Sequence, residues 1–248
     1  MNRPVLMTRL TILTAMALFA LSACTREMDA ARKAELAMIV QGGLMYDNWF
    51  ITLGKEAPKS TKFAYSSSGG KAQGADSWRC KECHGWDYLG KEPDYSSGNH
   101  FSGFPGIQNA INVSELSVLN NLKNTNHRYG EILSDQELKP LVAFLMKGQL
   151  EMRDHIDRGS KKAKGDSGAG KALYQKHCTS CHGDDGKKLK LGEEAQSRSL
   201  GAIAVEDPWK TLHKIRFGQP GKEAPSLLGA PVEQQVDVLA YAQTLPVR

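Results

Sequence analysis

Hydrophobic side chains recur at helical spacing in three parts of the chain. The first part predicts a helix over about 26–45, with apolar positions at Met28, Leu36, Ile39 and Val40. The other two parts each predict an amphipathic helix, with apolar positions at Leu138, Leu141, Val142 and Leu145 and at Val236, Leu239, Ala240 and Ala242. These two helices close two halves of the chain, so the pattern indicates two similarly organised domains.

Polar stretches divide the chain between these helices. A loop-like stretch follows the first helix and closes with the run Ser66–Gly70. A second stretch, from Arg158 to Gly170, is rich in Gly, Ser and Lys and has the composition of a linker. We therefore expect an N-terminal helix and spacer, a first domain, a linker and a second domain, at residues 24–65, 66–150, 151–164 and 165–248.

The first 23 residues have the layout of a secretory signal peptide. Arg3 and Arg9 precede an apolar run from Leu10 to Ala23 that is too short to span a bilayer, and the segment holds no acidic residue. Its end, Leu21-Ser22-Ala23-Cys24, resembles a bacterial lipoprotein signal, in which the cysteine is acylated and becomes the first residue. The resemblance implies a lipid anchor at Cys24 and a periplasmic protein. Thr25, where inner-membrane retention expects Asp, favours the outer membrane.

Composition and charge exclude several classes of protein. The chain has 248 residues, of which 40% are hydrophobic and 24% charged, so it is neither disordered nor fibrous. Thirty-two basic and 27 acidic residues give a net charge of +5, and removal of the two signal arginines lowers it to +3. The remaining charge is spread thinly, without the basic patch of a nucleic-acid-binding protein. No second apolar stretch approaches the ~20 residues of a membrane span.

The chemistry of the chain lies in a repeated five-residue motif. Cys80-Lys81-Glu82-Cys83-His84 recurs as Cys178-Thr179-Ser180-Cys181-His182, and every cysteine except Cys24 belongs to one of the two copies. The flanks also repeat, since Gly70, Lys71 and Trp78 precede the first copy much as Gly170, Lys171 and Tyr174 precede the second. We interpret this as an internal duplication.

The spacing within the motif suits covalent attachment of haem. Two cysteines three residues apart on a helical turn present both thiols on one side, where they can form thioether bonds to the two vinyl groups of one haem. The histidine that follows supplies an imidazole nitrogen as the proximal iron ligand. A zinc site usually has its cysteine pairs ~15 to 20 residues apart, and a thioredoxin-like dithiol needs a βαβ context. Disulfides would leave the adjacent histidines unexplained.

With these motifs the sequence resembles tandem dihaem members of the class I cytochrome c family. The resemblance covers residues 66–248, with Cys83-His84-Gly85-Trp86-Asp87-Tyr88 and Cys181-His182-Gly183-Asp184-Asp185-Gly186 as typical segments. It implies an all-α protein of two tandem class I cytochrome c domains behind an N-terminal signal and anchor segment. Each domain would hold one covalently attached haem c between an N-terminal helix ending in the motif and a crossing C-terminal helix.

The distal ligand of the second haem departs from the family pattern. Ala224 stands where the family has its methionine, and no methionine follows Met152. His213 is the one histidine after His182 and is therefore our candidate ligand for this iron. The alternatives are an open or water-bound iron, a lysine, or a residue from a partner. His213 would then face solvent or bind a haem propionate.

For the first haem, the predicted distal ligand is His127. It follows the helical stretch Ser114–Lys123 and precedes Arg128-Tyr129-Gly130, which aligns with Arg216-Phe217-Gly218 beside the distal loop of the family. The rivals are Met152, Met146, which has the surroundings of a core residue, His100 and His155. The resemblance also implies that a backbone carbonyl near Pro105 orients the proximal His84.

The resemblance implies a function in electron transfer. We expect a relay that passes electrons between redox partners in the periplasm or at the membrane, with no assigned catalytic residue. The alternative is a dihaem oxidoreductase whose open second haem acts on a small inorganic substrate. A haem-based sensor would need an output domain that the sequence does not contain. Lys187, Lys188 and Lys190 are either a docking rim for an acidic partner or a solvated loop.

Overall fold

We describe the fold from a computed structural model that covers residues 4–67, 70–92, 102–191 and 198–248, with side chains described from residue 27 onward apart from Ser66 and Ser67. Two compact units divide the chain, Met1–Ala37 and Met38–Arg248. The long helix α1, Pro4–Leu53, begins in the first unit and ends in the second. All haem-motif residues belong to the second unit, which the following paragraphs describe by itself.

The second unit is helical, as expected. In its first half, residues 38–150, the chain forms the end of α1, then α2 (Phe63–Ser67), α3 (Cys80–His84), α4 (Glu115–Lys123) and α5 (Asp135–Ala143), together with short 3-10 turns and a π-helical turn at Phe144–Gly148. The short helix α6 (Met152–His155) leads to the second half, residues 165–248, which forms α7 (Ser167–His177), α8 (Thr179–His182), α9 (Leu200–Glu206), α10 (Pro208–Phe217) and α11 (Val232–Ala242). Among the described residues, β-pairing is limited to three isolated bridges.

Helix α1 is longer than the 26–45 segment predicted from its apolar residues. It runs from Pro4 to Leu53, with one non-helical residue at Asn48 (φ −157°, ψ 92°). In the described part of the chain, no helix combines the length and the apolar character that crossing a membrane requires. The signal peptide and the anchor at Cys24 stay predictions.

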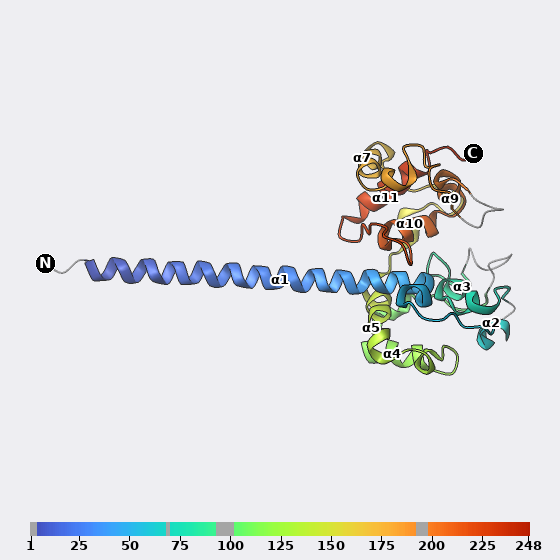
Figure 1. The fold of residues 1–248 in the computed structure, drawn as a ribbon, viewed down its shortest axis with the longest axis horizontal. Helices are drawn as coiled ribbons and strands as arrows, with labels where there is room; N and C mark the ends of the chain where they lie inside the picture. Colours follow the sequence, from blue (N-terminus) through green and yellow to red (C-terminus); the bar gives the residue numbers. More distant parts are fainter. Residues whose placement is uncertain (1–3, 68–69, 93–101, 192–197) are drawn as a thin grey trace. The chain divides into compact units, whose positions relative to one another are not determined.

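The end of α1 is part of the folded body. Met45, Tyr46 and Trp49 are completely buried. The backbone of α1 also approaches both halves closely, because a Cβ on Gly42 would overlap the carbonyl oxygen of Pro140, and one on Gly43 would overlap the ring of Phe217. Figure 1 shows this end of α1 with α4 and α5 on one side and α10 and α11 on the other.

A comparison of the halves shows which helix supports each motif. Tyr46, four residues after Gly42, donates to the carbonyl of Gly85 at 2.5 Å. Tyr174, four residues after Gly170, donates to the carbonyl of Gly183 at 2.8 Å. Gly42 lies against α5 and Gly170 against Asp237 of α11, so the end of α1 is the counterpart of α7.

The compact unit that holds the first motif therefore begins at residue 38 and not at 66, so the 24–65 segment is not a spacer throughout. Pairing Gly70 and Trp78 with Gly170 and Tyr174 was wrong because the two halves differ in one insertion. In the second half, α7 ends at His177, directly before the motif. In the first half, residues 54–79 intervene between α1 and Cys80.

The predicted linker at 151–164 is also packed against the body. Met152 and Ile156 are buried. Ile156 pairs with Ala163 in an isolated bridge, and the Arg158 guanidinium contacts the buried carboxylate of Asp87 at 3.0 Å. Its polar composition reflects a surface position, whereas two apolar side chains fix it in place.

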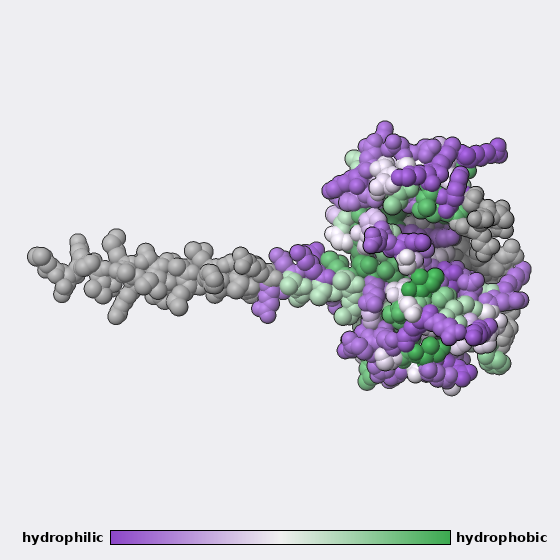
Figure 2. All heavy atoms as spheres, in the orientation of Figure 1, coloured by the Kyte–Doolittle hydropathy of each residue, from purple (hydrophilic) through white to green (hydrophobic). Residues whose placement is uncertain are grey.

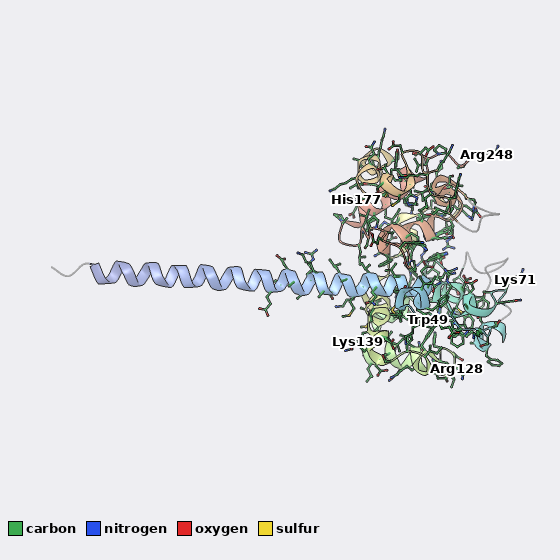
Figure 3. The ribbon with its side chains drawn as sticks, viewed as in Figure 1. Trp49, Lys71, Arg128, Lys139, His177 and Arg248 are labelled. Carbon is green, nitrogen blue, oxygen red and sulfur yellow. The ribbon has the colours of Figure 1, made fainter. Side chains whose placement is uncertain are left out.

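One hydrophobic core joins the two halves. Its buried cluster includes Tyr46, Trp49 and Leu141 from the first half and Leu212 and Leu239 from the second. Figure 3 marks Trp49 among the side chains of the first half and His177 in the second. The face of the second unit drawn in Figure 2 is mainly hydrophilic, with separate hydrophobic areas. A shared core makes the second unit one folding body with two motif sites.

Candidate haem-binding sites

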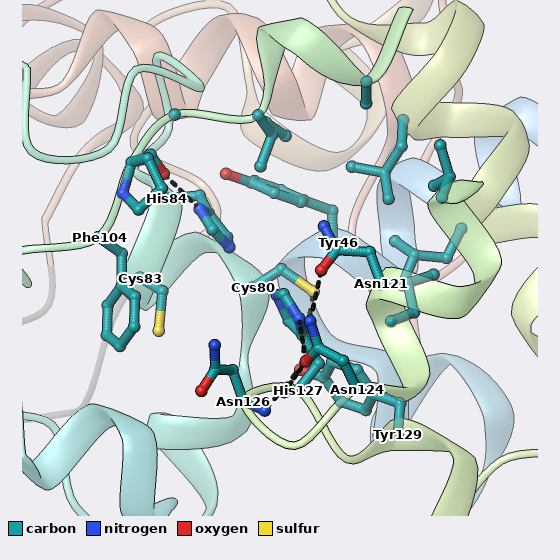
Figure 4. A pocket seen from close by; sticks show the side chains of 18 of the residues that line it. Tyr46, Cys80, Cys83, His84, Phe104, Asn121, Asn124, Asn126, His127 and Tyr129 are labelled. Atoms are coloured by element: carbon teal, nitrogen blue, oxygen red, sulfur yellow. Dashed lines mark hydrogen bonds between the residues drawn. The ribbon is translucent and has the colours of Figure 1, made fainter. Parts of the chain in front are cut away.

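The first motif forms the short helix α3 and opens onto a cavity of about 390 Å³. Cys80, Cys83 and His84 all line this cavity (Figure 4). The helix ends at Gly85, whose φ of +75° suits a residue without a side chain. Both cysteines are free thiols, and burial raises the pKa of Cys80 and raises that of Cys83 to about 12. The helix thus presents two protonated thiols and one imidazole to a single space.

His84 has the orientation that a proximal ligand needs. Its Nδ1 lies 2.7 Å from the carbonyl oxygen of Pro105, as expected from the sequence. Because a carbonyl can only accept, Nδ1 carries the proton and Nε2 keeps its lone pair. Burial lowers the pKa of His84 and so favours the neutral imidazole, which is the form that binds iron.

His127 faces the same cavity from the opposite side. Its ring centroid lies 6.1 Å from that of His84. Metal–imidazole bonds are about 2.0 to 2.1 Å long, so two imidazoles on opposite sides of one metal have centroids roughly 6 Å apart. Asn124 Oδ1 accepts from the backbone N–H of His127 at 2.9 Å and lies 3.2 Å from its Nδ1. The pKa of His127 is lowered to about 4, mainly by burial and to a smaller extent by the nearby His84 and Lys62.

The rival distal ligands of the first haem do not line this cavity. Met152 is completely buried in the hydrophobic core, and Met146 packs against that core. His155 is half-buried but also outside the cavity lining. His100 lies outside the described residues. The structure therefore brings together His84 and His127, the pair favoured from the sequence.

Lys62 is a cavity residue that the sequence analysis missed. It is only 6% exposed, and its Nζ lies 4.2 Å from the ring of Trp78 and 4.1 Å from that of Tyr129. The same Nζ donates to the backbone carbonyl of His127 at 2.5 Å. Burial lowers the pKa of Lys62 to about 8. Lys62 belongs to the insertion at 54–79, which gave no motif that could have identified it.

The second motif has the same local backbone but more open surroundings. Cys178 is half-buried and Cys181 is exposed. Gly183 repeats the positive φ of Gly85, at +76°. His182 has a buried Nδ1 without a hydrogen-bond partner among the described residues, and burial lowers its pKa.

The structure contradicts His213 as a ligand of the second haem. The side chain is 1% exposed and lies between the two halves, against rings of the first half. Its Nε2 is 3.0 Å from the carbonyl of Gly43, and its Nδ1 is 2.7 Å from the hydroxyl of Tyr88. Both nitrogens are hydrogen-bonded, so neither has a lone pair available for iron. Burial lowers its pKa to about 3. The family resemblance could not foresee this because Gly43 and Tyr88 are far away in the sequence.

The lysines after the second motif lie at the surface. Lys188 and Lys190 are exposed and Lys187 is half-buried. Lys188 Nζ donates to the backbone carbonyl of Ser180 at 2.6 Å, so this charge lies beside the motif helix. A docking role for the three lysines stays a prediction.

Comparison with known proteins gives one finding for the second half. Residues 167–246, which include the second motif, match the cytochrome c family model. No curated protein matches the chain. This segment is thus similar to a cytochrome c domain, and such a domain implies covalently bound haem c. The helical structure of residues 167–246 is consistent with the all-α fold of cytochrome c. A cytochrome c domain also suggests haem-based electron transfer. In the described residues, no group of three or more His, Cys, Asp or Glu side chains is arranged to hold a metal ion by itself.

Proposed function

We propose that the cytochrome c domain at residues 167–246 is the second of two, and that the chain is a dihaem electron carrier. Cys80, Cys83 and His84 would attach the first haem, and Cys178, Cys181 and His182 the second. The carrier would pass electrons between redox proteins of the periplasm or the membrane. It would be held at the membrane by a lipid on Cys24.

One observation carries the proposal of a first haem. His84 and His127 face each other across a cavity that also contains both thiols of the motif. The matched Tyr46–Gly85 and Tyr174–Gly183 hydrogen bonds support the same conclusion, since they give both motifs the same helix contact. The two halves therefore share a supporting framework as well as a motif.

The residues around the first haem would tune it in a defined way. A haem supplies reversible one-electron chemistry when bound. Pro105 fixes the ring of His84, and Asn124 fixes that of His127. Hydrogen bonds of this kind make imidazoles stronger ligands. Two histidine ligands favour a lower potential than a histidine and a methionine, so the first haem would be a low-potential carrier.

The haem count tests the proposal directly. We expect two haems per wild-type chain by absorption and mass, one in Cys80→Ala/Cys83→Ala, and one in Cys178→Ala/Cys181→Ala. A redox titration of the wild type should then contain two reversible one-electron steps. If the wild type holds a single haem, and only the double variant Cys178→Ala/Cys181→Ala loses it, the protein carries one haem and the dihaem proposal is contradicted. Metabolic labelling with a fatty acid, compared with Cys24→Ser, tests the anchor.

A second candidate function rests on the position of His213. Because Tyr88 and Gly43 engage both of its nitrogens, the second haem receives no ligand from it. The second iron would then have an open or water-bound position, which a dihaem oxidoreductase acting on a small inorganic molecule needs. Carbon monoxide bound by the reduced wild type, at one equivalent per two haems, would favour this function. No binding would favour the simple relay.

A further inference from the structure

Tyr88 has a costly backbone conformation within the interface between the halves. It lies four residues after His84 and has a φ of +67°, a region that large side chains rarely adopt. Its side chain is completely buried. The backbone carbonyl of Tyr88 accepts a hydrogen bond from the N–H of Ile107 at 2.9 Å. Such a conformation persists only where the surroundings compensate for its cost.

The compensation comes from the second half. Gly43 O is an acceptor, so His213 Nε2 carries the proton, and His213 Nδ1 accepts the hydroxyl proton of Tyr88 at 2.7 Å. The buried guanidinium of Arg216 interacts electrostatically with Tyr88. The tautomer of His213 is thus set by α1, and α10 contributes a hydrogen-bond partner to a tyrosine of the first half.

The bridge connects segments that lie next to both motif sites. Tyr88 belongs to the loop that follows the proximal ligand His84. His213 belongs to α10, which ends at Phe217 and leads to the loop where Ala224 replaces the family methionine. Trp86, from the same loop as Tyr88, lies 5.0 Å from His213 between ring centroids. Perturbing the bridge therefore affects the segments that carry both sites without touching a ligand.

We propose that the hydrogen bond between Tyr88 and His213 is a positioning contact that holds the two motif sites in one fixed geometry for electron exchange. This inference rests on the proposed dihaem function. The rate of electron transfer between two haems depends on their separation and orientation. An interface that holds both halves in one arrangement therefore gives a single transfer rate, and a loose interface gives a distribution of rates. His213 serves the second site by orienting its half, and not by binding its iron.

Two variants remove the contact from opposite sides in the full-length, haem-loaded protein. Tyr88→Phe keeps the ring and its packing but loses the hydroxyl. His213→Leu keeps a side chain of similar size but removes both the acceptor for Tyr88 and the donor for Gly43. Ser199→Ala is the control, because it also loses a buried side-chain hydroxyl, but one whose bond to the carbonyl of Pro246 stays within the second half. If one bridge variant does not fold, the other still tests the proposal.

Hydrogen–deuterium exchange and the rate of electron equilibration between the haems are the two measurements. We expect both bridge variants to speed amide exchange in residues 86–89 and 208–217 by roughly tenfold, the effect of one buried hydrogen bond. They should also slow and broaden inter-haem equilibration, while the haem absorption spectra stay those of the wild type. The double variant should be no worse than either single variant.

Exchange and equilibration at wild-type levels in both variants would overturn the proposal. So would a changed spectrum of the second haem in His213→Leu, since it would make His213 a ligand. If the wild type itself holds one haem, the proposed function fails, yet the exchange measurement still reports on the contact between the halves. The two failures are therefore distinguishable.

Discussion

The two halves have the same motif and the same supporting tyrosine, but they differ on the distal side. In the first half, His127 is held by Asn124 and faces His84 across the cavity. In the second, the one comparable histidine, His213, is hydrogen-bonded within the interface between the halves. The two halves therefore share the residues that would attach a haem, whereas the position of one histidine differs between them.

The largest expected effect concerns the distal ligand of the first haem. His127→Ala should open this iron, so that the reduced variant binds one more equivalent of carbon monoxide per chain than the wild type. His155→Ala is the control, because His155 lies in the adjoining segment but does not line the cavity. Absorption difference spectra measure the binding. Equal binding by His127→Ala and wild type would remove the ligand assignment and, with it, the contrast between the halves.

The next effect concerns Asp47, which contacts both halves. Its carboxylate is 1% exposed and pairs with Arg79 of the first half at 2.7 Å and with Lys214 of the second. Asp47→Asn leaves two cations without their partner, and we expect a loss of about 3 kcal/mol in the free energy of unfolding. Denaturant unfolding measures it. Asp76→Asn is the control, since this exposed residue pairs only at the surface with Arg79.

The same carboxylate predicts a pH dependence. Burial acts to raise the pKa of Asp47, but Lys214 and Arg79 outweigh it, so the net shift is downward. A carboxyl group with a lowered pKa stabilises the fold above its unfolded pKa of about 3.9 and loses that contribution as pH falls through the folded value. The wild type should therefore lose stability below about pH 4 more steeply than Asp47→Asn. Parallel curves would contradict the ion pairs.

A smaller effect tests whether the two halves are built alike. Gly42→Ala and Gly170→Ala each place a Cβ against a backbone carbonyl of the closing helix, at Pro140 and Asp237. We expect each to cost about 1 to 3 kcal/mol of stability, by overpacking. Gly159→Ala, whose Cβ would meet nothing closer than 3.7 Å, is the control. Thermal unfolding measures all three, and a neutral Gly42→Ala would disprove the equivalence of α1 and α7.

The smallest effect concerns the surface. Reversing Lys187, Lys188 and Lys190 to Glu should slow electron transfer to an acidic partner at low salt, with little effect at high salt. The matched control makes the same change in charge in the first half, at Lys71, Lys91 and Lys139. Stopped-flow rates at two salt concentrations measure it. Equal slowing by both sets of substitutions would show that the net charge of the protein causes the effect. If the first set causes no slowing, the three lysines belong to a solvated loop without a docking role.

Local features of the sequence predicted the helical class and the place of His127, which lies beside a recognisable Arg-aromatic-Gly segment and lines the same cavity as the first motif. Contacts between residues far apart in the sequence could not be predicted from local patterns. A helix was predicted at 26–45, but its contact with the first motif was not, because residues 54–79 separate Tyr46 from Cys80 and the flanking glycines suggested another pairing. His213 was misjudged because its partners are 125 and 170 residues away. Nothing in the composition of the insertion indicated a buried Lys62.

The position of the first supporting helix also determines where this chain can be cut. Side chains from Glu27 to Glu35 are exposed, whereas Ile39, Met45 and Trp49 are buried in the core shared by both halves. A protease that acts before residue 36 would release the body from its N-terminal segment with both motif sites intact. A cut at the apparent domain start, residue 66, would instead remove the helix that carries Tyr46 and Asp47, and both halves would lose a common support. The release point and the folding boundary thus lie only a few residues apart on one helix.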